Sequence, residues 1–321
     1  MPLTSTQLDH LDTYGYVVAE GLLDPEEHLG PITAEYHGVL DQLARDLVAA
    51  GSIESTYEEL PFGPRVTRIY AESGAAHHQY FDFSLPQKGI RADTPFWAGP
   101  AVFRTLTAPP LLDAVESVIG PEIYSNPVQH VRIKVPERDC PRTEAGDVIG
   151  GATPWHQDSG VVTEEADDTE TLTVWFPLRD AGVENGCLHV VPGTHRGEVL
   201  THCGGAQGLQ IPGALFDEES GRALPMRAGD VLFMHRRTIH GALPNVSDEI
   251  RWSLDLRYQP IGQPTGRDAF PGFVARSRAN PASELHDPVA WEESWRAARD
   301  RLAGEDDPTY NRWSSDDPAC A

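Results

Sequence analysis

The residues most capable of chemistry lie in Trp155-His156-Gln157-Asp158, where a histidine and an aspartate stand two positions apart. On an extended segment, side chains at positions i and i+2 point the same way, so this imidazole and this carboxylate can bind one metal ion together. A second histidine, His240, follows a predicted turn and an apolar strand. Two histidines and one carboxylate leave three adjacent coordination positions open, which suits non-heme Fe(II). We therefore predict that His156, Asp158 and His240 bind a catalytic iron.

Arg251 and Ser253, both downstream of His240, have the chemistry to bind the far carboxylate of a dicarboxylate whose other end coordinates the metal. Arg251 lies on the next predicted strand, and Ser253 follows two positions later on the same face. A guanidinium can bind a carboxylate through two parallel hydrogen bonds, and the hydroxyl can donate one more. 2-Oxoglutarate needs this arrangement, because its keto-acid end takes two metal positions and its other carboxylate needs a buried cation. The set predicts an oxygenase that uses Fe(II), 2-oxoglutarate and O2.

Two other functions are compatible with the same three ligands, because a His-x-Asp pair alone occurs by chance in many proteins. One is a zinc hydrolase, which would activate water and consume no O2. The other is a cupin-type barrel that binds a metal or small molecule without turnover. Arg251 and Ser253 argue against the second alternative, since a pure binding protein needs no additional carboxylate clamp at this spacing.

The elements that must position these residues are mostly short strands. Strands are predicted at 128–135, 172–178, 187–191, 231–234 and 251–258. Gly, Asn and Pro turns separate them, and Glu184-Asn185-Gly186 is a hairpin signal. Many short strands with such turns are typical of a sandwich or a barrel and not of a parallel α/β sheet.

Helices are predicted mainly outside this β region. Residues 24–51 carry an N-cap aspartate, apolar side chains at helical spacing and a terminal glycine, and so predict an amphipathic helix lying on a sheet. Residues 66–70 suggest a short strand, whereas 110–119 and the Trp291–Leu302 region predict helices. We expect one domain over 1–321, with helical and loop support at 1–122, a β core at 123–262 and a C-terminal extension at 263–321.

Several sequence blocks, in the same order, resemble the phytanoyl-CoA dioxygenase family of Fe(II)/2-oxoglutarate oxygenases. The matching blocks are residues 11–18, 154–158, 184–188, 191–196, 228–231 and 238–241, followed by Pro244-Asn245 and Arg251. Together they cover most of residues 4–260, and the combined pattern is specific.

The resemblance implies a mostly β fold with flanking helices, whose core is a double-stranded β-helix of the cupin-like, jelly-roll type. The family's metal triad falls on His156, Asp158 and His240, and its cosubstrate arginine on Arg251. It further implies that Trp175 lines the cosubstrate pocket and that Gln129 contacts the cosubstrate.

The resemblance also bears on the reaction. Related halogenases carry a small residue in place of Asp158, so halogenation is disfavoured here. Hydroxylation or oxidative cyclisation of a polar small molecule is expected, such as an intermediate of aminoglycoside or sugar-type antibiotic biosynthesis. The 137–152 loop and the segment after Gly262 depart from the family pattern, and we expect both to border the substrate.

The composition limits the partners. A formal net charge of −24 repels phosphate backbones, which disfavours nucleic acid, and would attract a cationic substrate. No long apolar run or secretory signal is evident, so we expect no membrane partner and a cytoplasmic location. The four cysteines lack regular spacing and are expected to be free thiols. The oligomeric state stays open, with a dimer as one option.

Overall fold

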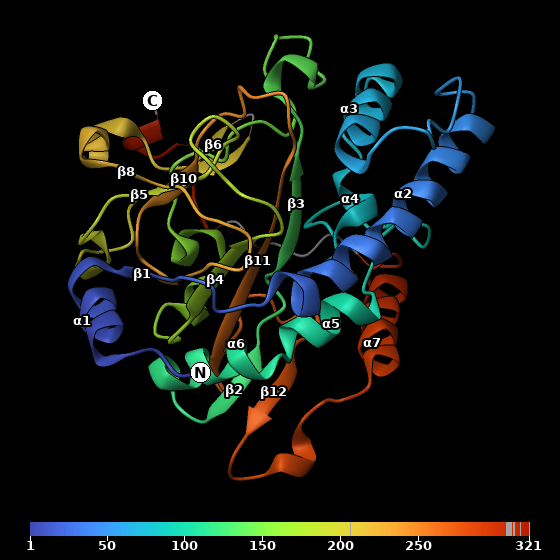
Figure 1. The fold of residues 1–321 in the computed structure, drawn as a ribbon. Helices are drawn as coiled ribbons and strands as arrows, with labels where there is room; N and C mark the ends of the chain where they lie inside the picture. The colour runs from blue at the N-terminus through green and yellow to red at the C-terminus, as the bar shows by residue number, and fades with distance from the viewer. Residues whose placement is uncertain (206, 306–309, 311, 315, 321) are drawn as a thin grey trace.

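Antiparallel β-sheets form the core of the structure; most of the helices pack along one side, whereas the N-terminal helix lies beside the first strand (Figure 1). The computed structural model describes residues 1–205, 207–305, 310, 312–314 and 316–320. The strands are β1 (Tyr16–Ala19), β2 (Glu122–Ser125), β3 (His130–Lys134), β4 (Leu172–Pro177), β5 (Leu188–Val190), β6 (Cys203–Gly205), β7 (Gly208–Gln210), β8 (Arg222–Leu224), β9 (Val231–His235), β10 (His240–Ala242), β11 (Arg251–Pro260) and β12 (Phe273–Ser277). The α-helices are α1 (Ser5–Tyr14), α2 (Gly30–Ala49), α3 (Phe62–Ser73), α4 (His78–Phe81), α5 (Pro100–Leu106), α6 (Pro109–Ile119) and α7 (Pro288–Leu302). Among the described helices, none is both long and apolar enough to cross a bilayer.

Two sheets form the core of the fold. The larger has the order β1-β9-β4-β11-β2-β12, with β3 also paired to β11, and the smaller has the order β10-β5-β8. Side chains from both sheets, such as Trp175 and Leu188, line one cavity between them. The predicted double-stranded β-helix with flanking helices is therefore confirmed. β1 and β12 come from the segments predicted to flank the core, so the larger sheet draws on the N-terminal and C-terminal parts of the chain as well.

The longest strand, β11, separates two environments by simple alternation. Its even-numbered residues Trp252, Leu254 and Leu256 belong to the hydrophobic core under the helices. Its odd-numbered residues include Arg251, Asp255 and Arg257, which line the cavity on the opposite face. β11 pairs with β3 and with β4, so the cavity-facing residues of three strands form one polar floor.

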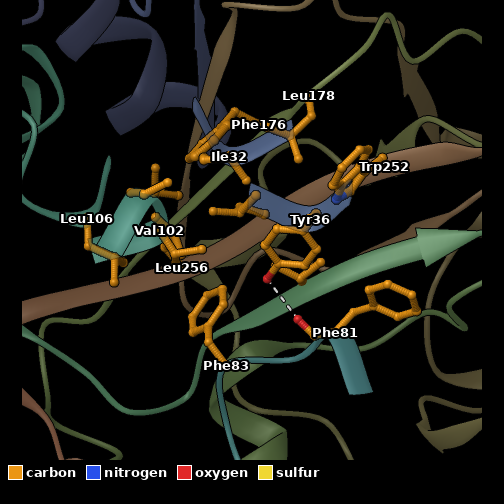
Figure 2. Packing of buried hydrophobic residues seen from close by; sticks show 14 of the residues in the cluster. Ile32, Tyr36, Phe81, Phe83, Val102, Leu106, Phe176, Leu178, Trp252 and Leu256 are labelled. Carbon is orange, nitrogen blue, oxygen red and sulfur yellow. Dashed lines mark hydrogen bonds between the residues drawn. The ribbon is translucent and has the colours of Figure 1, made fainter. Parts of the chain in front are cut away.

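Large aromatic side chains fill the layer between the sheet and the helices (Figure 2). Tyr36 of α2 packs edge-on against Trp252 of β11, with ring centroids 5.5 Å apart. Its hydroxyl donates a hydrogen bond to the carbonyl oxygen of Phe81 at 2.7 Å, so this buried polar atom is satisfied. Burial of these rings holds β11 rigidly, and β11 in turn carries the arginines of the site.

The predicted helices at 24–51, 110–119 and 291–302 are confirmed as α2, α6 and α7. The strand suggested at 66–70 is wrong, because those residues lie within α3. Phe62, Val66, Ile69 and Tyr70 are buried at helical spacing, a pattern that a five-residue window does not reveal. The predicted hairpin at Asn185-Gly186 is also wrong, since β4 pairs within the larger sheet and β5 within the smaller one. The turn therefore connects a strand of the larger sheet to a strand of the smaller sheet.

The prediction of four free thiols is wrong for two of them. Cys203 and Cys320 form a disulfide, with Cα atoms 5.5 Å apart, whereas Cys140 and Cys187 are free and buried. Cys203 and Cys320 are 117 residues apart, so their pairing left no local signal in the sequence. Next to this bond, the Trp313 indole donates to the Gly160 carbonyl oxygen at 2.6 Å. The C-terminal segment is thus fastened behind the loop that follows Asp158.

Candidate metal and cosubstrate site

Three side chains from distant parts of the chain converge at one end of the cavity. The Nε2 atoms of His156 and His240 lie 3.8 and 4.0 Å from Oδ1 of Asp158. One potential ligand atom from each residue lies within 4.8 Å of the others. This spacing leaves room for one ion between them, and two imidazoles with one carboxylate form the facial ligand set of non-heme iron. The predicted triad is thus brought together.

Backbone pairing fixes the two histidines relative to each other. The amide nitrogen of His156 donates to the carbonyl oxygen of His240 at 2.8 Å, and the reverse bond measures 3.0 Å. Gln157, which lies between His156 and Asp158 in the sequence, is fully buried, and its side chain forms hydrogen bonds outside the ligand cluster. Its amide donates to the Arg237 carbonyl oxygen and accepts from the Leu200 amide, both at 2.8 Å. The intervening residue therefore locks the ligand loop to the next segment of the barrel.

Hydrogen bonds also set which nitrogen each imidazole presents. Nδ1 of His156 lies 2.9 Å from the Pro154 carbonyl oxygen, and Nδ1 of His240 lies 3.0 Å from that of Thr238. A carbonyl only accepts, so each Nδ1 carries the proton and each Nε2 keeps its lone pair for a metal. Burial, helped by His240, holds the pKa of His156 well below its ordinary value. Both features fit a neutral imidazole ligand.

Asp158 is held as a carboxylate by partners that the sequence analysis did not select. Burial by itself would raise its pKa, but the Arg257 guanidinium and the two imidazoles outweigh that effect, and the pKa lies below the ordinary value. Arg257 Nη2 contacts Oδ1, and the Thr173 hydroxyl donates to Oδ2. Arg257 lies on the same face of β11 as Arg251, Ser253 and Asp255, because these residues are two positions apart. This alternation in the sequence could have identified Arg257 as a residue of the site.

Arg251 lies at the other end of the same strand face and has no acidic partner within the described part of the chain. It is 2% exposed, its Nη1 donates to the Ser253 hydroxyl at 2.6 Å, and its Nε has no partner. Its guanidinium lies over the Trp175 ring, 5.7 Å from the centroid. Burial lowers the pKa of Arg251 to about 10, so the cation is present at neutral pH without a counter-ion. A buried guanidinium without a counter-ion in a cavity can bind the carboxylate of a ligand.

Gln129 is a predicted site residue that neither lines the cavity nor contacts a residue of the predicted metal and cosubstrate site. Its neighbours Val128 and His130 line the cavity, whereas the Gln129 amide donates to the Ser125 hydroxyl at 2.9 Å. Gln129 is 1% exposed and precedes β3. Its contact with the cosubstrate stays a prediction.

The cavity has a volume of about 410 Å³, enough for 2-oxoglutarate and a small substrate. The 137–152 loop borders it through Gly150 and Gly151, and the segment after Gly262 borders it through Arg267. Their contact with the substrate stays a prediction. His78 of α4 lines the cavity next to Gly150, and its buried Nε2 has no hydrogen-bond partner in the described chain.

The sequence profile of the phytanoyl-CoA dioxygenase family matches residues 11–253, about three-quarters of the chain. This chain belongs to the phytanoyl-CoA dioxygenase family. A rat protein named phytanoyl-CoA dioxygenase domain-containing protein 1 is 25% identical over 78% of this chain and 87% of its own length. A phytanoyl-CoA dioxygenase of Arabidopsis thaliana is 30% identical, but the match spans 34% of this chain and 38% of that relative. The human peroxisomal phytanoyl-CoA dioxygenase is 26% identical over 55% and 51% of the two chains.

Solved structures support the fold of this family member. The non-heme monooxygenase ThoJ, in its apo form, is 17% identical and superposes with a TM-score of 0.56 over 92% of this chain and 96% of its own. The carbocyclase SnoK from nogalamycin biosynthesis is 18% identical, with a TM-score of 0.50 over 89% and 94%. With the family assignment and the His-Asp-His cluster, the predictions of enzyme class and of Fe(II), 2-oxoglutarate and O2 as cofactors are confirmed.

Proposed function

We propose that this enzyme couples the oxidative decarboxylation of 2-oxoglutarate to the oxidation of a polar small molecule, with the outcome of hydroxylation or oxidative cyclisation. The observation that supports it best is the unpaired guanidinium of Arg251, buried beside Ser253 and Trp175 in the cavity that holds the triad. A metal site that acted without a carboxylate cosubstrate would have no use for this cation. The proposal thus favours an oxygenase over a zinc hydrolase.

Each group of the chain has a defined task in this reaction. His156, Asp158 and His240 would hold ferrous iron, which with 2-oxoglutarate supplies the oxidising chemistry when both are bound. Arg251 and Ser253 bind the far carboxylate and so fix the orientation of the cosubstrate. Trp175 covers that pocket with an apolar face and excludes water, which strengthens the ion pair.

The substrate is proposed to be a sugar-type intermediate of secondary metabolism. A 410 Å³ cavity shared with 2-oxoglutarate suits a molecule of this size. The prediction of a cationic substrate came from the net charge alone, and the charges inside the cavity favour another class, discussed below. The cytoplasmic location stays a prediction.

The test is anaerobic addition of Fe(II) and then 2-oxoglutarate to the metal-free protein. We expect a weak visible charge-transfer band that requires both additions, and succinate release when O2 is admitted. The matched pair of variants is His240→Ala, which should lose the band, and His286→Ala, which changes an exposed histidine outside the cavity and should keep it. A protein that binds zinc, hydrolyses a substrate and releases no succinate would refute the proposal in favour of the hydrolase.

A further inference from the structure

The charge of the cavity is opposite to that of the molecule. The chain has 49 acidic and 25 basic residues. Five of those bases nevertheless line this one cavity: Arg132, Lys134, Arg251, Arg257 and Arg267. The acidic residues that line it are Asp82 and Asp255. An acidic protein that gathers cations around its site has an electrostatic preference there for anions.

Each acid in and beside the cavity already contacts a specific partner. Asp82 Oδ2 lies 2.7 Å from Nδ1 of His130. Asp255 lies 3.3 Å from Nη1 of Arg257, whose other terminal nitrogen contacts Asp158. Arg257 is therefore paired as well. In the described chain, none of these acids lies within ion-pair distance of the remaining four bases.

Three of the four remaining bases gather where the cosubstrate is proposed to bind. Lys134 stands directly across from Arg251 in the β3–β11 register, and Arg132 stands across from Ser253. Nζ of Lys134 donates to the Gly151 carbonyl oxygen at 2.5 Å and to the Thr153 hydroxyl at 2.7 Å. We therefore assign Lys134 and Arg132 to the same end of the cavity as the far carboxylate of 2-oxoglutarate.

Arg267 also lines the cavity, close enough to Arg257 for the two charges to interact, and is 3% exposed. Its partners are neutral: Nη2 donates to the Val161 carbonyl oxygen at 2.8 Å, the Gln87 amide lies 2.9 Å from Nη2, and the Tyr310 ring covers its guanidinium at 4.7 Å. Nε has no partner, and no carboxylate in the described chain lies within ion-pair distance. A buried guanidinium without a counter-ion costs stability unless a ligand supplies the anion.

We propose that Arg267 binds an anionic group of the substrate, a carboxylate or a phosphate, at the Arg257 end of the cavity. The inference rests on the proposed function, because the opposite end is reserved for 2-oxoglutarate. Asp158 contacts Arg257, so the metal ligands adjoin the Arg267 end as well. A substrate anchored at Arg267 extends toward the metal from the side away from Arg251. The cosubstrate and the substrate then have separate guanidinium anchors.

The test uses the Fe(II) enzyme under anaerobic conditions with saturating 2-oxoglutarate, titrated calorimetrically with butyrate in one arm and methyl phosphate in the other. We expect weak binding of at least one probe, reduced roughly 10- to 100-fold in Arg267→Gln, since a charge-assisted hydrogen bond is worth about 1.5–3 kcal/mol. Arg267→Lys keeps the charge and should lose less. Arg104→Gln, an exposed arginine outside the cavity, is the matched control. Thermal melts of each variant verify folding.

The Arg251→Gln variant separates this inference from the proposed function. If it loses 2-oxoglutarate but still binds the probe, the Arg267 site exists independently of the cosubstrate site. Probe binding that is unchanged in Arg267→Gln, or that only competes with 2-oxoglutarate, would overturn the inference. A screen of sugar acids and sugar phosphates against their neutral parent sugars gives the second readout. Stimulated succinate release by the acids supports Arg267 as the anchor, and stimulation by neutral or amino sugars alone contradicts it.

Discussion

Replacement of Arg251 by methionine should separate ligand binding from stability. The guanidinium is 2% exposed and has one side-chain hydrogen bond, to Ser253, and no acidic partner in the described chain. Loss of one partner of a buried charge pair costs about 2–5 kcal/mol of binding free energy. The Kd of 2-oxoglutarate should therefore rise roughly 30- to 4,000-fold in Arg251→Met. Ser253→Ala removes one hydrogen bond and should raise it roughly 2- to 12-fold.

The same substitution should leave the metal-free, cosubstrate-free protein at least as stable as the wild type. Arg251 is a buried cation without a counter-ion until a ligand arrives, and methionine has a similar length without the charge. We therefore expect the free energy of unfolding of Arg251→Met to be unchanged or higher. Urea denaturation measures this, and its slope shows whether the unfolding transition is comparable.

The assay for binding is calorimetry on the anaerobic Fe(II) protein, with the cosubstrate-induced rise in Tm as a second measure. At a ligand concentration 100 times Kd, binding stabilises the wild type by about 2.7 kcal/mol, and most of that shift should vanish in Arg251→Met. Arg104→Gln should match the wild type. A Kd within tenfold of the wild-type value in Arg251→Met would refute the assignment of this arginine, because the buried cation would then have another use.

Three further predictions concern the support of the metal ligands. Arg257→Gln should lower the unfolding free energy of the metal-free protein by about 3–5 kcal/mol at pH 7. Because the pKa of Asp158 is depressed in the folded wild type, the stability difference between wild type and variant should shrink below about pH 4. Urea denaturation at several pH values measures this difference. Gln157→Ala leaves buried backbone groups without partners and should cost about 1–3 kcal/mol while weakening Fe(II) binding in an anaerobic titration. Cys320→Ser opens the bond to Cys203 and should lower stability by about 2–4 kcal/mol in the same melts, whereas an unchanged midpoint would mean that the bond does not form in solution.

Sequence reasoning reached the residues whose chemistry depends on spacing or on the family pattern. His156 and Asp158 are two apart on an extended segment, and Arg251 and Ser253 repeat this spacing, so both pairs were predictable from strand geometry. Their convergence with His240 required the family resemblance as well, since nothing local connects distant strands.

The missed residues act through contacts that only the fold creates. Arg257 was visible as part of the β11 alternation, but its pairing with Asp158 depends on where the ligand loop crosses the sheet. Arg267 lies beyond the region matched to the family, and its burial depends on Tyr310, far along the chain. The Cys203–Cys320 bond joins residues 117 positions apart, a separation at which sequence spacing carries no information.

The covalent link at the C-terminus has a practical consequence for handling this enzyme. The ring of Trp313 stacks on His202, and His202 Nε2 accepts from the backbone amide of Gln157, the residue between two metal ligands. An affinity tag fused just after Cys320 would pull on that chain of contacts, so purification is better served by a tag at the other terminus. Thiol reductants, often added to keep iron ferrous, would cut the link, whereas ascorbate would maintain the iron and spare it.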